Sequence, residues 1–534
     1  MKRVKFRLMA LVLAMALLLS GCALDFAGYF ARLANVFRPV TFENMIYTHP
    51  EPELLDDALA ACLQSAKGSD LDKLVSHINT LNSVCNSFQT NYYLSYIHYS
   101  IDMTDTYWAA EYEHCSQLNT RVQAAVDELM YALAASDLRD ELESEDYFGA
   151  GYFDGYDGES LWTEEFTALK YRETELINAY YDLSSMAGTM DIHSETFYST
   201  LGLQMEAVYA DLVKVGLELA KEAGYDRYAE YAYDFVYNRD YTPDQAATLV
   251  GNIRQELVGV YEGLIGSNIW TNVEYSLEDQ TFAYVQSLAQ AMGGAVQDAF
   301  TTMEKGGLYH ISYGPNKLNA SFEVYLPEYD VPFVFINPTL TQYDQLTFAH
   351  EFGHFCADYV TGGGMPGIDV GEVLSQGMEY LSLCYAEGGE GLTKLKMADS
   401  LSVYLEQAFL ADFEDRLYQM AAEEVTAENI RSLYGRVAEE YGLGELVDSR
   451  GYVNVTHLFT SPMYVISYVV SNDAAMQLYQ MERRETGSGL QCYVQSLSTS
   501  QNGFVAFLKE AGLESPFEAG HIKAVKELFQ QILK

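Results

Sequence analysis

Basic side chains are scarce in this chain of 534 residues. It has 31 Lys and Arg against 76 Asp and Glu, so its formal net charge at pH 7 is −45. Such a surface repels phosphate backbones and anionic lipid headgroups, which excludes nucleic acid and anionic membrane surfaces as partners. The simpler interpretation of the charge is solubility, and the alternative is that it steers cationic peptides toward the protein.

Cysteine is also scarce, and its positions are scattered. The chain has seven Cys and none of them forms a C-x-x-C pair, which argues against a zinc site built from cysteine. In an exported protein the group Cys62, Cys85 and Cys115 could hold one disulfide. Buried free thiols are the alternative that we favour.

Long apolar runs are absent except near the N-terminus. Four basic residues among the first seven precede an apolar run over residues 8–19, which ends in Leu19-Ser20-Gly21-Cys22. This order is typical of a secretory signal, and the ending resembles the lipobox of bacterial lipoproteins, which implies cleavage before Cys22 and lipidation of its thiol. We therefore expect an exported protein, lipid-anchored to the outer face of the bacterial cell membrane.

The rest of the chain has neither a Ser/Gly/Pro-rich tether nor a visible repeat. We divide it into a signal peptide, 1–21, a membrane-proximal segment, 22–50, an N-terminal helical region, 51–220, and a region that carries the motifs described next, 221–534. Apolar spacing in the second part predicts an amphipathic helix, which lies on the membrane or packs on the body. The acidic insert 137–165 lacks the alternation of an EF-hand and is predicted to be a loop or hinge.

Apolar residues recur at helical spacing over most of the chain, so the predicted fold class is mainly α. Thr242 with Pro243 and Gln245 predicts a capped helix up to about residue 264. Three short β-prone runs, 308–313, 321–326 and 332–337, predict a small sheet. A helix over about 342–360 follows, capped by Thr341 with Asp344 and ended by a triple glycine.

That last helix carries the sequence His350-Glu351-Phe352-Gly353-His354. Two His four residues apart lie on one helix face and can bind the same zinc ion, and the carboxylate of Glu351 can then act as a general base on water. Catalytic zinc has three protein ligands. We predict one Zn²⁺ per chain on His350, His354 and Glu372.

Alternatives to Glu372 as the third ligand remain, because the helix expected from about residue 369 also carries Asp369 and Glu379. Asp358, Asp369 and Gln376 are candidates for orienting the ligands, and for Asp358 a solvated position at the helix end is the alternative. Cys356 is rotated off the ligand face.

Further along, His457 precedes Tyr464 and Tyr468, which are four residues apart and are expected on one helix face. Such a cluster can donate hydrogen bonds to an oxyanion. A packed tyrosine stripe is the alternative, because Tyr is abundant, with 43 residues.

Together these segments resemble the zinc oligopeptidases, the group of thimet oligopeptidase and, closer to this chain, oligoendopeptidase F. The resemblance covers roughly residues 220–475, and it rests on the sequences listed here: Gly224 to Ala232, Phe333 to Asn337, Leu346 to His354, Glu372 with Ser375-Gln376, and His457 to Tyr468. The chain departs from that group at Ala357, at Val373-Leu374-Ser375 and at Ile466.

The resemblance implies zinc on His350, His354 and Glu372, with Glu351 as the base. It also implies transition-state stabilisation by His457 with Tyr464 and Tyr468. The implied fold is a two-lobed helical zinc-peptidase around a deep channel, with the zinc peptidase catalytic region at 221–534 and a small sheet next to the metal helix. Strand residues 320–325 would line the channel and pair with the substrate backbone.

The predicted function is therefore a monomeric zinc metalloendopeptidase that hydrolyses short oligopeptides at the cell surface. A carboxypeptidase or dipeptidase on the same fold is one alternative. A non-enzymatic peptide-binding envelope lipoprotein is the other, and it is disfavoured because both His, the base and a suitable carboxylate are present.

Overall fold

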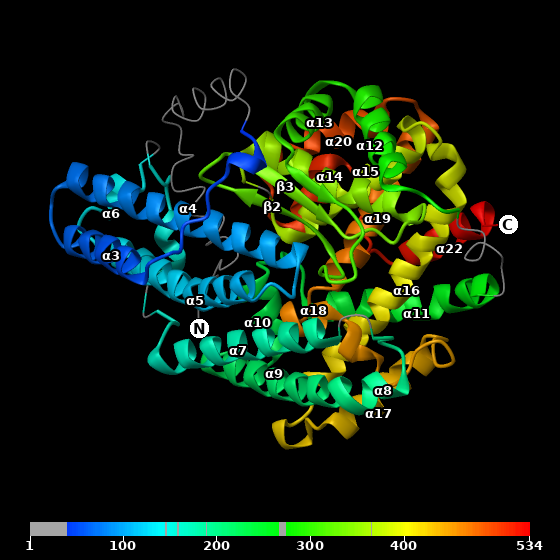
Figure 1. Ribbon diagram of the computed structural model, residues 1–534, viewed down its shortest axis with the longest axis horizontal. Helices are drawn as coiled ribbons and strands as arrows, with labels where there is room; N and C mark the ends of the chain where they lie inside the picture. The colour runs from blue at the N-terminus through cyan, green and yellow to red at the C-terminus, as the bar shows by residue number, and fades with distance from the viewer. Residues whose placement is uncertain are drawn as a thin grey trace.

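The computed structural model describes residues 40–144, 147–156, 158, 160–187, 190–265, 274–364 and 366–533. The predicted signal peptide, Cys22 and the predicted amphipathic helix lie outside these ranges. Within them, no helix combines the length and the apolar character that crossing a membrane requires. The chain folds mainly into helices, with one small sheet (Figure 1).

Three long helices form the N-terminal part of the molecule: α3 (Pro52–Ala66), α4 (Leu71–Ile101) and α5 (Thr106–Ala134). They bury a core of their own, which includes Cys62, Cys85 and Cys115. All three are free thiols, so the favoured alternative to a disulfide is confirmed. The described residues of the acidic insert hold only short helices, α6 (Arg139–Leu142) and η2 (Tyr152–Tyr156), and the start of α7, so a loop is confirmed there.

A second group of helices leads to the sheet. Its members are α7 (Glu164–Ala187), α8 (Glu195–Phe197), α9 (Leu203–Glu222), α10 (Tyr228–Tyr231), α11 (Pro243–Ile265), α12 (Glu278–Met292) and α13 (Gly294–Gly306). The capping box predicted before α11 is present, because the Gln245 backbone N–H donates to the Thr242 hydroxyl and the Thr242 N–H donates to the Gln245 side chain.

The sheet has three strands in the order β1-β3-β2. They are β1 (Tyr309–Ile311), β2 (Ser321–Leu326) and β3 (Val331–Ile336), close to the predicted runs. β3 pairs parallel with β1 and antiparallel with β2, and all six of its residues are buried. β2 is therefore an edge strand, with one side free of sheet partners.

Two helices after the sheet form the centre of the molecule, α14 (Tyr343–Thr361) and α15 (Ile368–Tyr385). Gly362 ends α14 in the left-handed region with a φ of 66°, as the triple glycine predicts. The predicted cap at the other end is wrong in detail. The Asp344 carboxylate accepts the backbone N–H groups of Thr339 and Thr341, and Gln342 is the residue that flanks the helix.

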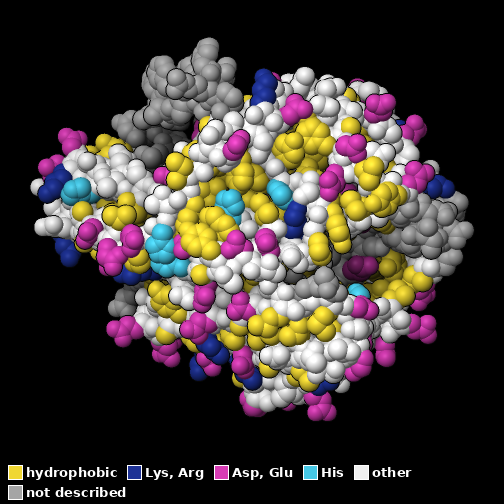
Figure 2. Space-filling view, in the orientation of Figure 1, with side chains coloured by type: hydrophobic (Ala, Val, Ile, Leu, Met, Phe, Trp, Pro, Cys, Tyr) yellow, Lys and Arg dark blue, Asp and Glu magenta, His cyan; other side chains and the backbone are white. Residues whose placement is uncertain are grey.

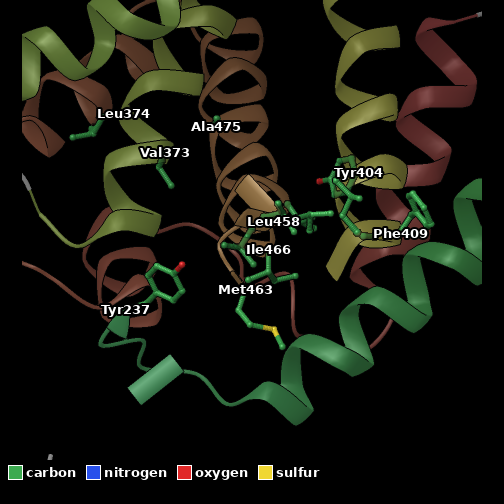
Figure 3. Close-up of a cluster of buried hydrophobic side chains, with 14 of the residues drawn as sticks. Tyr237, Val373, Leu374, Tyr404, Phe409, Leu458, Met463, Ile466 and Ala475 are labelled. Atoms are coloured by element: carbon green, nitrogen blue, oxygen red, sulfur yellow. The ribbon is translucent and has the colours of Figure 1, made fainter. Parts of the chain in front are cut away.

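The C-terminal helices complete the fold. They are α16 (Thr393–Leu417), α17 (Ala427–Glu440), α18 (Thr456–Thr460), α19 (Ile466–Arg484), α20 (Ser488–Ser496), α21 (Phe504–Ala511) and α22 (His521–Ile532). Figure 3 shows buried side chains meeting at this centre, with Val373 and Leu374 from α15, Ala475 from α19, and Tyr404 from α16. The core therefore runs through α15, α16 and α19.

The helices form two halves with the sheet and α14 in one and α7, α9 and α17 in the other (Figure 1). The molecule is hollowed between them on the face that Figure 2 shows. The predicted fold class, a two-lobed and mainly helical structure with a small sheet beside α14, is confirmed. The predicted division into four regions stays a prediction.

Candidate active site

Helix α14 presents His350 and His354 to one side, one turn apart, with ring centroids separated by 5.1 Å. Their Nε2 atoms lie 3.4 Å and 3.8 Å, respectively, from Oε2 of Glu372 on α15. The three ligand atoms all lie within 4.8 Å of one another. Among the described residues, this is the only group of at least three His, Cys, Asp or Glu side chains that converge in this way.

Gly353 explains how α15 comes so close to α14. A Cβ atom added at Gly353 would lie 2.6 Å from the Cα of Ser375 and 2.7 Å from the carbonyl oxygen of Leu374. Any other residue would therefore force the two helices apart. The glycine between the two His thus permits the approach that brings Glu372 to them.

The chemistry of this donor set fits zinc, which takes imidazole nitrogens and carboxylate oxygens in catalytic sites. Burial lowers the pKa of His354 to about 4, so this imidazole is neutral at pH 7. Burial alone would raise the pKa of Glu372, but hydrogen bonding and charge from His350, together with His354, lower it to about 2. A neutral imidazole and an ionised carboxylate are the forms that bind a metal. Burial lowers the pKa of His350, but the Glu372 and Glu379 carboxylates raise it above its ordinary value overall, so a metal bound there displaces a proton.

Glu379 orients the first His. Its Oε1 lies 2.7 Å from Nδ1 of His350, and its Oε2 lies 2.7 Å from Nζ of Lys396, whose side chain is buried. The sequence predicts Glu379 only as an alternative third ligand. The structure instead places it on the far nitrogen of His350, while Asp369 lies beside Arg239, 3.5 Å from its Nε.

Glu351 is buried and borders the same cavity as His350 and His354. Burial raises its pKa to about 7, and the Glu372 and Glu379 carboxylates act in the same direction, while His350 opposes them. A carboxylate whose pKa lies near the working pH is suited to take and return a proton. The position that the motif predicts for this side chain is therefore compatible with a general base.

His457, Tyr464 and Tyr468 also meet at the site. The Tyr464 hydroxyl donates to Oε1 of Glu372 at 2.5 Å, and the Tyr468 hydroxyl lies 3.1 Å from Nε2 of His457. One detail of the prediction is wrong: Tyr464 does not share a helix face with Tyr468, because α19 begins only at Ile466. Met463 has a φ of 65°, which no α-helix contains, so Tyr464 lies in a turn.

The structure also shows the surroundings of two residues that were candidates for orienting the ligands, Asp358 and Gln376. Asp358 is buried, so the alternative of a solvated helix-end acid is wrong. The Gln376 amide donates to the Tyr468 carbonyl and to the Ser471 hydroxyl, and it therefore holds α19 rather than a ligand. Cys356 is fully buried and does not belong to the converging group of ligand atoms, in agreement with its predicted orientation.

The site opens into a cavity of about 980 Å³. Residues that line it include Tyr96 of α4, Tyr181 of α7, residues 319–323 at edge strand β2, and residues 454–457 before and within α18. Four acidic side chains border it: Glu323, Glu351, Glu372 and Glu406. The cavity thus joins both halves of the molecule, and no Lys or Arg of the described residues borders it.

Comparison with known proteins is consistent with this geometry. Residues 42–157 match the Peptidase M3 N-terminal domain. No curated protein matches the sequence. Among solved structures, one described as an oligoendopeptidase F superimposes with a TM-score of 0.81 at 18% identity, and the match covers 92% of this chain and 98% of that one.

Two other structures are similar over the same share of the chain. PZ peptidase A with an inhibitor has a TM-score of 0.81 at 19% identity, covering 92% of this chain and 99% of that one. An oligoendopeptidase F from Bacillus anthracis has a TM-score of 0.77 at 19% identity, covering 92% and 98%. Residues 42–157 therefore match an M3 N-terminal domain, and the chain has the fold of oligoendopeptidase F.

Proposed function

We propose that the chain is a zinc-dependent endopeptidase that hydrolyses short, unfolded peptides. One observation carries this proposal: the donor atoms of His350, His354 and Glu372 converge beside the buried carboxylate of Glu351, at the wall of a large cavity. Zinc bound there would act as a Lewis acid on the scissile carbonyl and on water. The M3 family generally uses zinc, which agrees with this donor set.

Each side chain then has a role that follows from its chemistry. Glu351 accepts a proton from the attacking water and returns it to the leaving amine. The Tyr468 hydroxyl and the His457 imidazole are hydrogen-bonding groups beside the same cavity, suited to the charge that develops on the carbonyl oxygen. Tyr464 joins them when its hydroxyl turns from Glu372, to which it donates in this structure. Glu379 keeps the His350 ring in one orientation through Nδ1.

The composition of the cavity wall favours cleavage within a peptide over removal of its C-terminal residue. A carboxypeptidase or a dipeptidase has to bind the free α-carboxylate, and Arg or Lys is the usual partner for such a group. The described residues that border this cavity include neither, so no cationic side chain there pairs with a peptide C-terminus. An internal peptide bond needs no such partner.

The size and position of the cavity favour short substrates. At about 980 Å³ it is at the upper end of the range of about 300–1,000 Å³ for small-molecule sites, so several peptide residues fit. The wall takes residues from both halves of the chain, from α4 and α7 as well as from α14 and α15. A short, flexible peptide can enter such a recessed site more readily than a backbone segment of a folded protein.

Where the reaction takes place is also a proposal. The basic and apolar N-terminus and Cys22 support export and a lipid anchor at the outer face of the cell membrane. Peptides outside the cell would then be the substrates.

A mixed peptide library tests the proposed activity. The purified protein is incubated with the library, with and without a chelator, and the products are read by mass spectrometry. Internal cleavage that the chelator abolishes and added zinc restores supports the proposal. Products shortened only by one or two residues at the C-terminus would favour the carboxypeptidase or dipeptidase alternative, and an intact library would favour a peptide-binding protein.

A further inference from the structure

The turn that carries Tyr464 has an unusual backbone. It joins α18, which ends at Thr460, to α19, which begins at Ile466. Met463 in this turn has a φ of 65°, a left-handed backbone conformation that residues other than glycine rarely adopt. Such strain persists only where the surroundings hold it in place. Figure 3 shows the Met463 side chain pointing toward α11, next to the buried cluster.

Three side chains from distant segments hold the backbone of this turn. The Tyr237 hydroxyl donates to the Pro462 carbonyl at 2.8 Å, and Nη1 of Arg239 donates to the Met463 carbonyl at 2.9 Å. The Met463 backbone N–H donates to Oε1 of Glu414 at 2.9 Å. Consecutive backbone polar groups of the turn are therefore fixed from outside.

Arg239 makes the most contacts of the three. Its Nη2 also donates to the Tyr464 carbonyl at 3.4 Å and to the Ser467 hydroxyl at 2.7 Å. Its guanidinium carbon lies 4.4 Å and 4.5 Å from the ring centroids of Tyr233 and Tyr237, respectively. The side chain is fully buried, so its planar set of donors is held in a single orientation.

The same guanidinium also contacts the helix that carries Glu372. Its Nε lies 3.5 Å from Oδ2 of Asp369, in the first turn of α15, and Glu372 follows three residues later. Arg239 therefore touches both segments whose side chains meet in the hydrogen bond between Tyr464 and Glu372. Neither the HExxH motif nor the tyrosine pair contains this residue.

We propose that Arg239 is a positioning residue that sets the Tyr464 hydroxyl against Glu372 and the reaction cavity. It does so by holding the strained turn 462–464 at a fixed distance from the first turn of α15. The effect on catalysis rests on the proposed peptidase function. The effect on the position of Tyr464 does not, because it follows from the contacts of Arg239 alone.

A double-mutant cycle between Arg239→Lys and Tyr464→Phe tests the proposal. Lysine keeps the charge beside Asp369 but cannot make the forked contacts to the turn. Loss of two or more such hydrogen bonds predicts a fall in kcat of about 10- to 100-fold, with KM changed by less than about two-fold. In the Tyr464→Phe background, Arg239→Lys is expected to change kcat by less than about two-fold, because the hydroxyl that it positions is gone.

The same loss of kcat in both backgrounds would overturn the proposal, because Arg239 would then act independently of Tyr464. Arg254→Lys is the matched control. Arg254 lies on α11 and contacts Asp412 and Glu440, not the turn, so its replacement is expected to leave kcat unchanged.

A milder variant covers the case in which Arg239→Lys does not fold. Tyr237→Phe removes only the hydrogen bond to the Pro462 carbonyl, and it is expected to lower kcat about three- to ten-fold. This loss should also disappear in the Tyr464→Phe background, and a loss that persists there counts against the positioning of Tyr464 by this turn.

A structural measurement separates failure of this proposal from failure of the proposed function. If the wild-type protein cleaves no peptide, the peptidase function fails, whereas Arg239 can still be tested in a crystal structure of the Arg239→Lys protein. The expected result is that the Tyr464 hydroxyl lies beyond hydrogen-bond range of Glu372. A Tyr464 that stays 2.5 Å from Oε1 of Glu372, as in the wild type, would overturn the positioning role.

Discussion

Nδ1 of His350 lies 2.7 Å from Oε1 of Glu379. Because a carboxylate can only accept this hydrogen bond, Nδ1 carries a proton, and Nε2, on the side of His354 and Glu372, is the nitrogen left for a metal. The other oxygen of Glu379 binds the buried ammonium of Lys396 at 2.7 Å. The ring orientation of His350 is therefore fixed by an ion pair in the core of the protein.

We expect replacement of this ion pair to weaken zinc binding without unfolding the protein. In Glu379→Met/Lys396→Met both charges of this pair are removed together, and Asp399, the other partner of Lys396, is partly exposed to water, so stability changes little. The His350 ring loses its acceptor, which predicts a zinc affinity about 10- to 100-fold lower. Competition with a chromogenic chelator measures this affinity.

Glu379→Gln/Lys396→Met is the matched control. The glutamine side-chain oxygen can still accept the hydrogen bond from His350, so zinc affinity should fall much less than in the Met/Met variant. Equal zinc affinities in these two variants would show that orientation by residue 379 is unimportant.

Gly353 offers a second prediction, because the contact of α14 with α15 leaves no space for a side chain there. In Gly353→Ala the added methyl group would lie 2.6 Å from the Cα of Ser375, which predicts a loss of about 1–3 kcal/mol in the free energy of unfolding. Separation of the helices should also lower zinc affinity. Urea denaturation and chelator competition measure the two effects.

Gly251→Ala on α11 is the control for this substitution. No atom lies within 4 Å of the Cβ that it adds, so stability should be equal to that of the wild type or higher by up to about 1 kcal/mol, as for glycine in a helix. If Gly353→Ala behaves like Gly251→Ala, the close approach does not constrain residue 353.

A third prediction concerns stability and pH, away from the zinc site. Nε2 of His521 on α22 lies 2.8 Å from Oδ1 of the fully buried Asp473 on α19. Burial lowers the pKa of His521, but the hydrogen bond and charge of Asp473, with Glu514 nearby, raise it above 6.5 overall. Because the folded pKa is the higher one, this pair stabilises the fold fully below pH 6.5 and loses that contribution as pH rises through the folded value.

The comparison of wild type with His521→Gln tests this sign. The free energy of unfolding of the two proteins should differ most at pH 6 and less at pH 9, as measured by urea denaturation. A difference that is constant or grows with pH would mean that His521 is neutral in the folded protein.

The fourth prediction concerns the N-terminus. If the thiol of Cys22 carries lipid, Cys22→Ser should move the protein from the membrane fraction to the soluble fraction of cells. Cys384→Ser, at a partly buried free thiol, should leave it in the membrane fraction. Continued membrane association of the Cys22→Ser protein would point to an uncleaved N-terminal helix as the anchor.

Local patterns in the sequence predict much of this structure. The period of apolar residues gives the long helices, and the β-prone runs give β1, β2 and β3 to within a few residues. The HExxH motif gives the face that carries His350 and His354, because helix geometry alone decides it. Glu372 is harder to predict as a ligand, because its distance from His350 and His354 depends on how α14 and α15 pack.

Features that depend on tertiary contacts were predicted less well. Glu379 follows Glu372 by seven residues, on the same face of α15, so sequence could not tell a ligand from an orienting carboxylate. Tyr464 and Tyr468 are spaced as on a helix, yet Arg239, Tyr237 and Glu414 hold the turn at Met463. Arg239 itself belongs to no motif, and its positioning role becomes visible only from its burial between the turn and α15.

The most direct test of the central claim uses Glu351→Gln and a peptide blocked at both ends. The account predicts that wild-type protein with about one zinc per chain cleaves this peptide internally, and that Glu351→Gln binds the same amount of zinc but loses at least about 1,000-fold in kcat, because no carboxylate takes the proton from water. Wild-type turnover by Glu351→Gln, or full cleavage by metal-free protein, would contradict it.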